Sequence, residues 1–397
     1  MIKIPQHTIY LQDGSLFNFK RRFKNYRSSL IEVFSQVGDG RSKFGKQHPL
    51  PLILFILFGG MTSGYTTIKD CRLWFIHNKK WAQKFVIMPH GVPDERTLSR
   101  AIQKTDIDSL VAAFIRWNRI VYGASSLAAS FDGKTMRGVH GTGVIRHMLS
   151  LFTHTTHQIL GQIGVSKKEN EIPAFHRLLK QVPSVAGMLL LGDALHTQKE
   201  TINAIIDKKA DYLLFVKGNQ EALMQHLSLF FTDVPFGVKL EHTTYHDNLR
   251  ERNVTTTITI SHDKTMCNYL ATDWQNVVTI GKLHRTGTRK TAEGKIVAID
   301  EAYFLISSRH LTAEQVALHT RNHWQIENNL HWQKDWTFLE DKQTLRSGNA
   351  PQVMSFLRSM CISLFATFQF SSVSGTIKNF QMQKSLHHQF LSVASVV

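Results

Sequence analysis

The sequence predicts an α/β protein with three kinds of segment: a basic helical N-terminal domain, a core in which strands and helices alternate, and a β-rich insertion within that core. Two observations predict this organisation. Residues 1–122 have apolar residues at helical spacing, whereas short apolar runs typical of strands begin at about residue 127. A chain of 397 residues with 42% hydrophobic residues can bury a core of this size in two or three domains.

Four helices are expected in the N-terminal part. Leu50–Met61 is almost wholly apolar and predicts a buried helix, and Ile68–Phe85 alternates apolar and basic residues at helical spacing. A breaker segment rich in Pro and Gly leads into Asp94–Ile102, and another amphipathic stretch runs to about Tyr122.

The charge of the chain is concentrated in this N-terminal part. Residues 1–120 contain 19 Lys and Arg against 8 Asp and Glu, which is +11 of the net +17. This excess favours a polyanionic partner, nucleic acid first and an anionic membrane second. Arg96 and Arg100, on short helices around a tight turn, could enter a DNA groove; a helical dimerisation or packing module is the alternative.

The core begins with three strands and continues as alternating helices and strands. The expected elements are strands at 127–131, 147–154 and 158–166, a helix at 171–182, a strand at 187–191, a helix at 197–207, a strand at 212–216 and a helix at 219–231. Thr197 and Glu200 are spaced as a capping box, and Asn219 could cap the last helix. Three antiparallel strands followed by βα units are the order of a ribonuclease H-like sheet, so we expect a ribonuclease H-like catalytic core.

The second half of the chain divides in the same way. Helical periodicity disappears from about Thr232 to Arg309, which predicts the β-rich insertion. A helix is expected from Thr312, with Gln315 completing a capping box, to about Trp336. Pro351 suits the first turn of a last helix. The expected boundaries are 1–122, 123–231, 232–310, 311–370 and a loosely held polar tail at 371–397.

Three carboxylates stand at informative places in this pattern. Asp132 and Asp193 each end a predicted strand, where an α/β sheet exposes functional side chains. Glu327 lies on the helix after the insertion, where His323, Glu327, His331 and Lys334 share one face. Carboxylate oxygens are the ligands that Mg²⁺ and Mn²⁺ prefer, and two such ions can promote phosphodiester cleavage. Each residue alone could be a turn, cap or surface residue, but together they predict a site for two Mg²⁺ ions, with Mn²⁺ as a substitute.

Further polar side chains are candidates for DNA contacts. Lys134, Arg137, Lys217, Asn219 and Gln220 gather around the predicted strand ends and could hold phosphates or bases. Ordinary loop polarity is the alternative.

Three other residues have competing interpretations. His154 and His157 flank a predicted turn; a zinc pair is conceivable, but exposed turn histidines are favoured. Trp274, the one tryptophan of the insertion, could stack on an unpaired base, but we favour a place in the core.

Several segments resemble one known family, the H-repeat-associated transposases of ISAs-type insertion sequences. The resemblance rests on Asp-Gly-Lys-Thr-Met-Arg-Gly (132–138), Asp-Tyr-Leu-Leu-Phe-Val-Lys-Gly-Asn-Gln (211–220), His-Trp-Gln-Ile-Glu-Asn-Asn-Leu-His-Trp (323–332), Glu-Asp (340–341) and Arg-Ser-Gly-Asn-Ala-Pro (346–351). The stretch from Asp39 to Pro93 resembles the associated N-terminal domain. The likeness covers roughly residues 35–370.

The resemblance implies Mg²⁺-dependent cleavage and transfer of the element's own DNA ends, with Asp132, Asp193 and Glu327 as the catalytic triad. It also implies phosphate contacts at the positions of His323 and Lys334. Asn328 and His331, on the same helix, are further candidates for DNA contacts. His323 stands where related transposases with a β-rich insert have an arginine, whereas the basic residue seven positions after the glutamate is present as Lys334.

The expected partners are DNA, both the element ends and a target, and a second copy of the chain on that DNA. Met1–Tyr10 lacks the apolar core of a signal peptide, and the apolar run Leu50–Phe58 is shorter than the roughly 20 residues that span a bilayer. We therefore expect a cytoplasmic, nucleoid-associated protein. Three rivals remain open: a domesticated DNA-binding protein, a metal-dependent nuclease that no longer transposes, and a zinc hydrolase using His323 and His331 with Glu327.

Overall fold

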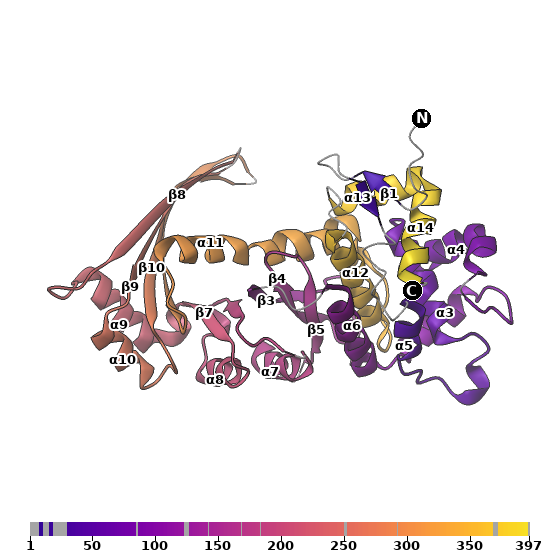
Figure 1. Ribbon diagram of the computed structural model, residues 1–397, viewed down its shortest axis with the longest axis horizontal. Helices are drawn as coiled ribbons and strands as arrows, with labels where there is room; N and C mark the ends of the chain where they lie inside the picture. The colour runs from indigo at the N-terminus through magenta and orange to yellow at the C-terminus, as the bar shows by residue number, and fades with distance from the viewer. Residues whose placement is uncertain are drawn as a thin grey trace.

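One nine-stranded sheet runs through the molecule, with the strand order β5-β4-β3-β6-β7-β11-β10-β9-β8 (Figure 1). The structure is a computed structural model. It describes residues 8–10, 16–18, 30–84, 86–122, 127–141, 143–167, 169–182, 184–249, 252–291, 293–367 and 372–395. The strands are β3 (Ala128–Thr135), β4 (His147–Thr153), β5 (Ile159–Val165), β6 (Leu189–Gly192), β7 (Asp211–Val216), β8 (Glu241–Leu249), β9 (Arg252–Ser261), β10 (Thr279–Lys290) and β11 (Ile296–Ser307). A separate pair, β1 (Thr8–Tyr10) and β2 (Leu16–Asn18), lies near the N-terminus.

The first five strands of the sheet follow the order expected from the sequence. β3, β4 and β5 are antiparallel, and β6 and β7 join β3 in parallel. Helices α7 (Glu171–Gln181) and α8 (Lys199–Asp207) come between these strands. β3 is longer than expected, because it stays paired with β4 as far as Thr135. Asp132 is therefore inside the strand and not at its end.

The segment expected as a β-rich insertion extends this same sheet. β11 pairs with β7, and β10, β9 and β8 follow in turn. These four strands, β8 to β11, form the long curved part of the sheet in Figure 1. Helix α10 (Lys264–Ala271) interrupts the strands, so the expectation that this region lacks helix was wrong. Trp274 follows α10 and is 7% exposed, which confirms the favoured interpretation as a core residue.

Two hydrophobic cores lie on opposite faces of the sheet, because successive residues of a strand point to opposite sides. Leu190 of β6 packs into the larger core with α7 and α8, while Leu189 and Leu191 pack into a smaller core with α11 (Ala313–His323). α11 begins with the expected capping box, Thr312 with Gln315. Beyond it the chain continues in the wider π-helical winding of η4 (Ile326–His331) and η5 (Gln333–Thr337).

The two other expected caps were wrong. The Thr197 hydroxyl donates to the backbone oxygen of Phe215, and α8 starts at Lys199 with no side-chain cap. The Asn219 amide donates to the backbone oxygen of Ala194, and α9 (Glu221–Thr232) also lacks a side-chain cap. Both side chains instead tie neighbouring loops to strand ends.

The N-terminal part is helical, as predicted. Its helices are α2 (Leu30–Ser35), α3 (Leu50–Thr62), α4 (Ile68–Ala82), α5 (Glu95–Gln103) and α6 (Ile107–Tyr122). α3 is buried on all sides, which its apolar sequence requires. In the described part of the chain no helix is long and apolar enough to cross a membrane.

The expectation of a loosely held tail after residue 371 was wrong. After α12 (Ala350–Thr367), helices α13 (Val373–Met382) and α14 (Lys384–Ser395) return to the N-terminal helices (Figure 1). The imidazole of His388 stacks on Trp81 of α4, with ring centroids 4.2 Å apart. His387 places Nε2 2.8 Å from the Thr62 hydroxyl and Nδ1 3.0 Å from the Ser63 hydroxyl. The segment expected as a polar tail therefore also has buried residues, which pack against the N-terminal helices.

This docking should weaken in mild acid. Burial lowers the pKa of His387 to about 3, so the folded protein excludes a proton that the unfolded chain binds below about pH 6.5. The stability contributed by this site is therefore present above pH 6.5 and is lost as the pH falls toward 3. Between pH 7 and 5, His387→Gln should lose about 2 kcal/mol less unfolding free energy than the unchanged protein. Urea unfolding at both pH values measures this; an equal loss in both proteins would contradict it.

Candidate functional site

The three predicted carboxylates line one cavity of about 690 Å³, although they come from distant parts of the chain. Asp132 and Asp193 both lie two residues beyond the last parallel pair of β3 and β6, Ser130 with Leu191. Adjacent strands thus carry them to the same edge of the sheet. Glu327 reaches the cavity from η4 on the opposite wall.

The cavity also has basic and aromatic walls. Lys217 Nζ lies 5.1 Å from the ring centroid of Tyr303, and the Arg321 guanidinium lies 4.7 Å from that of Tyr245. Arg285 also lines the cavity. Tyr245, Arg285 and Tyr303 belong to strands β8, β10 and β11, so the segment expected as an insertion forms one wall of the candidate site.

Negative charge is concentrated around Asp132. Burial raises its pKa to about 7, and the neighbouring charges of Glu171, Asp193 and Glu327 act in the same direction. Burial also raises the pKa of Glu327. A bound cation would relieve this repulsion.

The donors fit Mg²⁺ or Mn²⁺ by their chemistry, since they are hard carboxylate oxygens in a partly open cavity. Among the described residues, however, no group of three or more His, Cys, Asp or Glu side chains is arranged as a metal cluster. The Asp193 carboxylate accepts a hydrogen bond from the backbone N–H of Leu195 at 3.1 Å, as the cap of a short 3₁₀ turn. Binding an ion would therefore require some rotation of these side chains.

The helix on the far wall lies along β3. Ser130, Asp132 and Lys134 point to one face of the strand. His323 Nδ1 lies 2.9 Å from the Ser130 hydroxyl, and His331 Nδ1 lies 3.5 Å from Asp132 Oδ2. Burial lowers the pKa of His323 to about 4 and that of His331 to about 3, so both imidazoles are neutral at pH 7.

His154 was expected to be exposed, and that expectation was wrong. It is 4% exposed, and its Nε2 lies 2.7 Å from the Ser130 hydroxyl. His157 has a left-handed backbone, and its Nε2 lies 2.9 Å from Gln325 Oε1. His154 thus joins the end of β4 to β3, and His157 joins the turn after β4 to the helical segment at Gln325.

Sequence reasoning missed Glu171, whose carboxylate lies beneath Asp132. Its two oxygens lie 2.8 Å from His147 Nε2 and 3.0 Å from His196 Nε2. The site needs Gly133, because a Cβ there would lie 2.4 Å from both Glu171 Oε1 and His147 Nε2. No spacing rule links residues 24 or 25 positions apart, so only the folded structure shows that Glu171 lies between His147 and His196.

The expected DNA contacts divide into three groups. Lys217, His323 and Asn328 line the cavity. Arg137 is exposed, with its Nε 3.8 Å from Asp341 Oδ2. Arg96 and Arg100 are exposed on α5, in the N-terminal helices.

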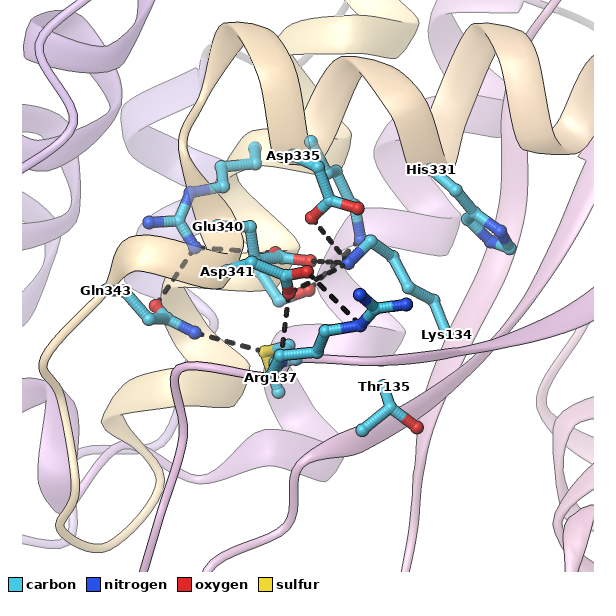
Figure 2. Close-up of polar contacts among 12 residues, drawn as sticks. Lys134, Thr135, Arg137, His331, Asp335, Glu340, Asp341 and Gln343 are labelled. Carbon is cyan, nitrogen blue, oxygen red and sulfur yellow. Dashed lines mark hydrogen bonds and ion pairs between the residues drawn. The ribbon is translucent and has the colours of Figure 1, made fainter. Parts of the chain in front are cut away.

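The remaining candidates are already engaged with the protein. Asn219 and Gln220 donate to the backbone oxygens of Ala194 and Thr197, and so hold the turn after Asp193. His331, Lys134 and Lys334 are 9%, 8% and 1% exposed, respectively. Neither lysine lines the cavity. Lys134 faces the carboxylates of Asp335, Glu340 and Asp341 (Figure 2). Lys334 donates to the Ser355 hydroxyl and lies near the charge of Glu340.

Known proteins are similar to this chain over most of its length. A family model described as the transposase DDE domain matches residues 125–364, and a model associated with that domain matches residues 31–118. A putative transposase, YncI, of Escherichia coli O157:H7 is 28% identical over 345 residues, covering 85% of this chain and 87% of its own. The H repeat-associated putative transposase YhhI of Escherichia coli K12 is 26% identical over 352 residues, covering 84% and 89%.

Among solved structures, the cryo-EM structure of a piggyBac transposase synaptic complex with hairpin DNA aligns with a TM-score of 0.45 and 12% identity. The alignment covers 97% of this chain and 82% of that one.

Proposed function

Because the chain belongs to the transposase DDE domain family, we propose that it cuts and rejoins DNA at the ends of its own insertion sequence, with divalent metal ions held by Asp132, Asp193 and Glu327. The observation that carries this proposal is the convergence of the three carboxylates on one cavity. The mixed order of β3 to β7, with α7 and α8 on one face, supports a ribonuclease H-like core.

Each wall of the cavity has a part in this reaction. Bound Mg²⁺ supplies charge stabilisation to the attacking and leaving oxygens of a phosphodiester. Asp132, Asp193 and Glu327 provide the ligand oxygens, and Lys217 and Arg321 lie where they can hold phosphates. Asn328 can donate to a phosphate or a base edge. Neutral His323 holds Ser130 and so fixes β3 beside the helix.

A cleavage assay tests the proposal. Purified protein is incubated with DNA from the flanks of its gene, with Mg²⁺, with Mn²⁺ or with EDTA. Cation-dependent nicks at the element ends, and joined products, are expected. The mass of the complex should correspond to two copies on DNA. Specific binding without cleavage would identify a domesticated DNA-binding protein, and cleavage without joining would identify a nuclease.

Lys217 should contribute to DNA affinity through a phosphate. Each such contact changes the dependence of log affinity on log salt by roughly 0.9. Lys217→Ala should therefore flatten that slope by about one contact and weaken binding to specific and random DNA alike. Lys199→Ala is the matched control, since Lys199 pairs with Asp273 on the surface. Equal slopes for the two variants would contradict a phosphate contact at Lys217.

A further inference from the structure

Lys134 connects the strand that carries Asp132 to the chain that follows Glu327. Its Nζ lies 2.7 Å from Asp335 Oδ1, 3.4 Å from Asp341 Oδ1 and 3.5 Å from Glu340 Oε2. Figure 2 shows the ammonium group facing these carboxylates. An ammonium has three N–H donors, and three carboxylates surround this one. Lys134 is thus fully engaged within the protein.

The far side of this cluster is buried more deeply. Glu340 Oε1 lies 3.4 Å from Arg358 Nη1, and both side chains are 1% exposed. Lys334 donates to the Ser355 hydroxyl at 3.0 Å. Burial alone would raise the pKa of Glu340, but Lys334, Arg358 and Lys134 hold it down at about 2. Lys134, Lys334 and Arg358 surround three carboxylates, and the exposed Arg137 also lies 3.8 Å from Asp341. The cluster thus joins β3, η5 and α12 as one unit.

The backbone adds a second connection. The N–H of Arg137 donates to Asp341 Oδ1 at 2.9 Å. A Cβ on Gly138 would lie 2.4 Å from the backbone oxygen of Asp341, so the backbone at Gly138 is in direct contact with the backbone at Asp341. Leu339, between η5 and η6 (Glu340–Lys342), has a φ of 50°, a left-handed conformation that is uncommon for leucine. Surrounding contacts must hold such a turn in place.

We propose that Lys134 is a positioning residue, which fixes the spacing of Asp132 and Glu327 by holding segment 335–341 against β3. This inference rests on the proposed function of the three carboxylates. Asp132 precedes Lys134 by two residues on the same face of β3, and the π-helical η4 and η5 lead from Glu327 to Asp335. A shift at Asp335 is therefore passed along the helix to Glu327. A misplacement of about 1 Å in an active site can cost roughly 100-fold in rate.

The experiment compares Lys134→Met, Lys134→Arg and the control Lys199→Met, which removes a surface Lys–Asp pair. Mn²⁺ binding to the DNA-free protein is followed by electron paramagnetic resonance. DNA affinity, thermal midpoint and single-turnover cleavage against Mn²⁺ concentration are measured in parallel. A merely structural role would lower the folded fraction, but would leave the Mn²⁺ concentration for half-saturation unchanged in the folded molecules.

For Lys134→Met we expect half-saturation at roughly tenfold higher Mn²⁺, a cleavage rate lower by roughly 10- to 100-fold and unchanged DNA affinity. Lys134→Arg should recover most of both, and Lys199→Met should match the unchanged protein. Unaltered Mn²⁺ binding in folded Lys134→Met would overturn the inference, as would a loss of DNA affinity without a change in Mn²⁺ binding.

A variant that does not fold and a protein that does not cut DNA can each be distinguished from a failure of the inference. If Lys134→Met does not fold, Asp335→Asn takes its place, because it removes the nearest carboxylate and leaves Glu340 and Asp341. It should raise the Mn²⁺ requirement in the same direction, and unaltered Mn²⁺ binding in it would overturn the inference. If the unchanged protein binds Mn²⁺ but cuts no DNA, the proposed function fails while the binding comparison still tests Lys134.

Discussion

Asp132→Asn, Asp193→Asn and Glu327→Gln should each reduce DNA cleavage by about 1,000-fold or more. Each change removes one anionic oxygen from a cavity in which several kcal/mol of charge stabilisation depend on bound ions, and every 1.36 kcal/mol is a factor of about ten. The amides have almost the same shape as the acids. DNA affinity should therefore fall by less than about threefold, and with the three carboxylates of the cavity reduced to two it can even rise, because less negative charge faces the DNA phosphates.

Asp273→Asn is the matched control for these variants, because it neutralises an exposed carboxylate that pairs with Lys199 and does not line the cavity. It should cut DNA at the rate of the unchanged protein. Single-turnover rates and binding isotherms on the same DNA separate chemistry from affinity. Full activity in any of the three cavity variants would remove that residue from the proposed metal site.

Glu340→Ala should be the most destabilising single substitution in the ion-pair cluster. It leaves Lys334 and Arg358 buried without their central carboxylate, and breaking a buried pair in this way costs about 3–5 kcal/mol. The unfolding free energy from urea titration measures the loss. The thermal midpoint should fall with it.

A triple variant tests the cause of that loss. Replacing a buried ionic group as a whole by apolar residues of similar volume is often neutral. Glu340→Leu combined with Lys334→Met and Arg358→Met should therefore recover most of the stability that Glu340→Ala loses. A loss below about 1 kcal/mol in Glu340→Ala would mean that water reaches these charges.

The sequence predicted the elements of the core because their periodicity is local. Leu189–Leu191 is apolar on both sides, as a strand between two cores requires. The capping box of Thr312 and Gln315 predicted the start of α11. Asp132 and Asp193 could be placed close together because they follow neighbouring parallel stretches of β3 and β6, although β3 continues past Asp132 beside β4. Glu327 comes from η4, which no strand pattern places. That the three carboxylates line one cavity is shown; their role in binding metal stays a prediction.

The predictions that the structure contradicts concern residues whose contacts are with distant parts of the sequence. Thr197 and Asn219 have the composition of helix caps, but nearby backbone oxygens compete for their hydrogen-bond donors. From the sequence, Lys134 and Lys334 were expected to contact phosphates, but in the folded protein both lie beside the carboxylate of Glu340. The α-helical face drawn through Glu327 and Lys334 also assumed 3.6 residues per turn, whereas this stretch is π-helical and directs Lys334 inward.

The return of α13 and α14 to the first helices has a consequence for synthesis. On the ribosome, α3 and α4 emerge about 300 residues before His387 and His388, which complete their packing. The basic N-terminal helices therefore stay partly uncovered until α14 has been made, and apolar α3 is exposed to chaperones and to other nascent chains until then. A chain cut short before α13 should accumulate as an aggregate or a chaperone complex, even though its cavity residues are all present.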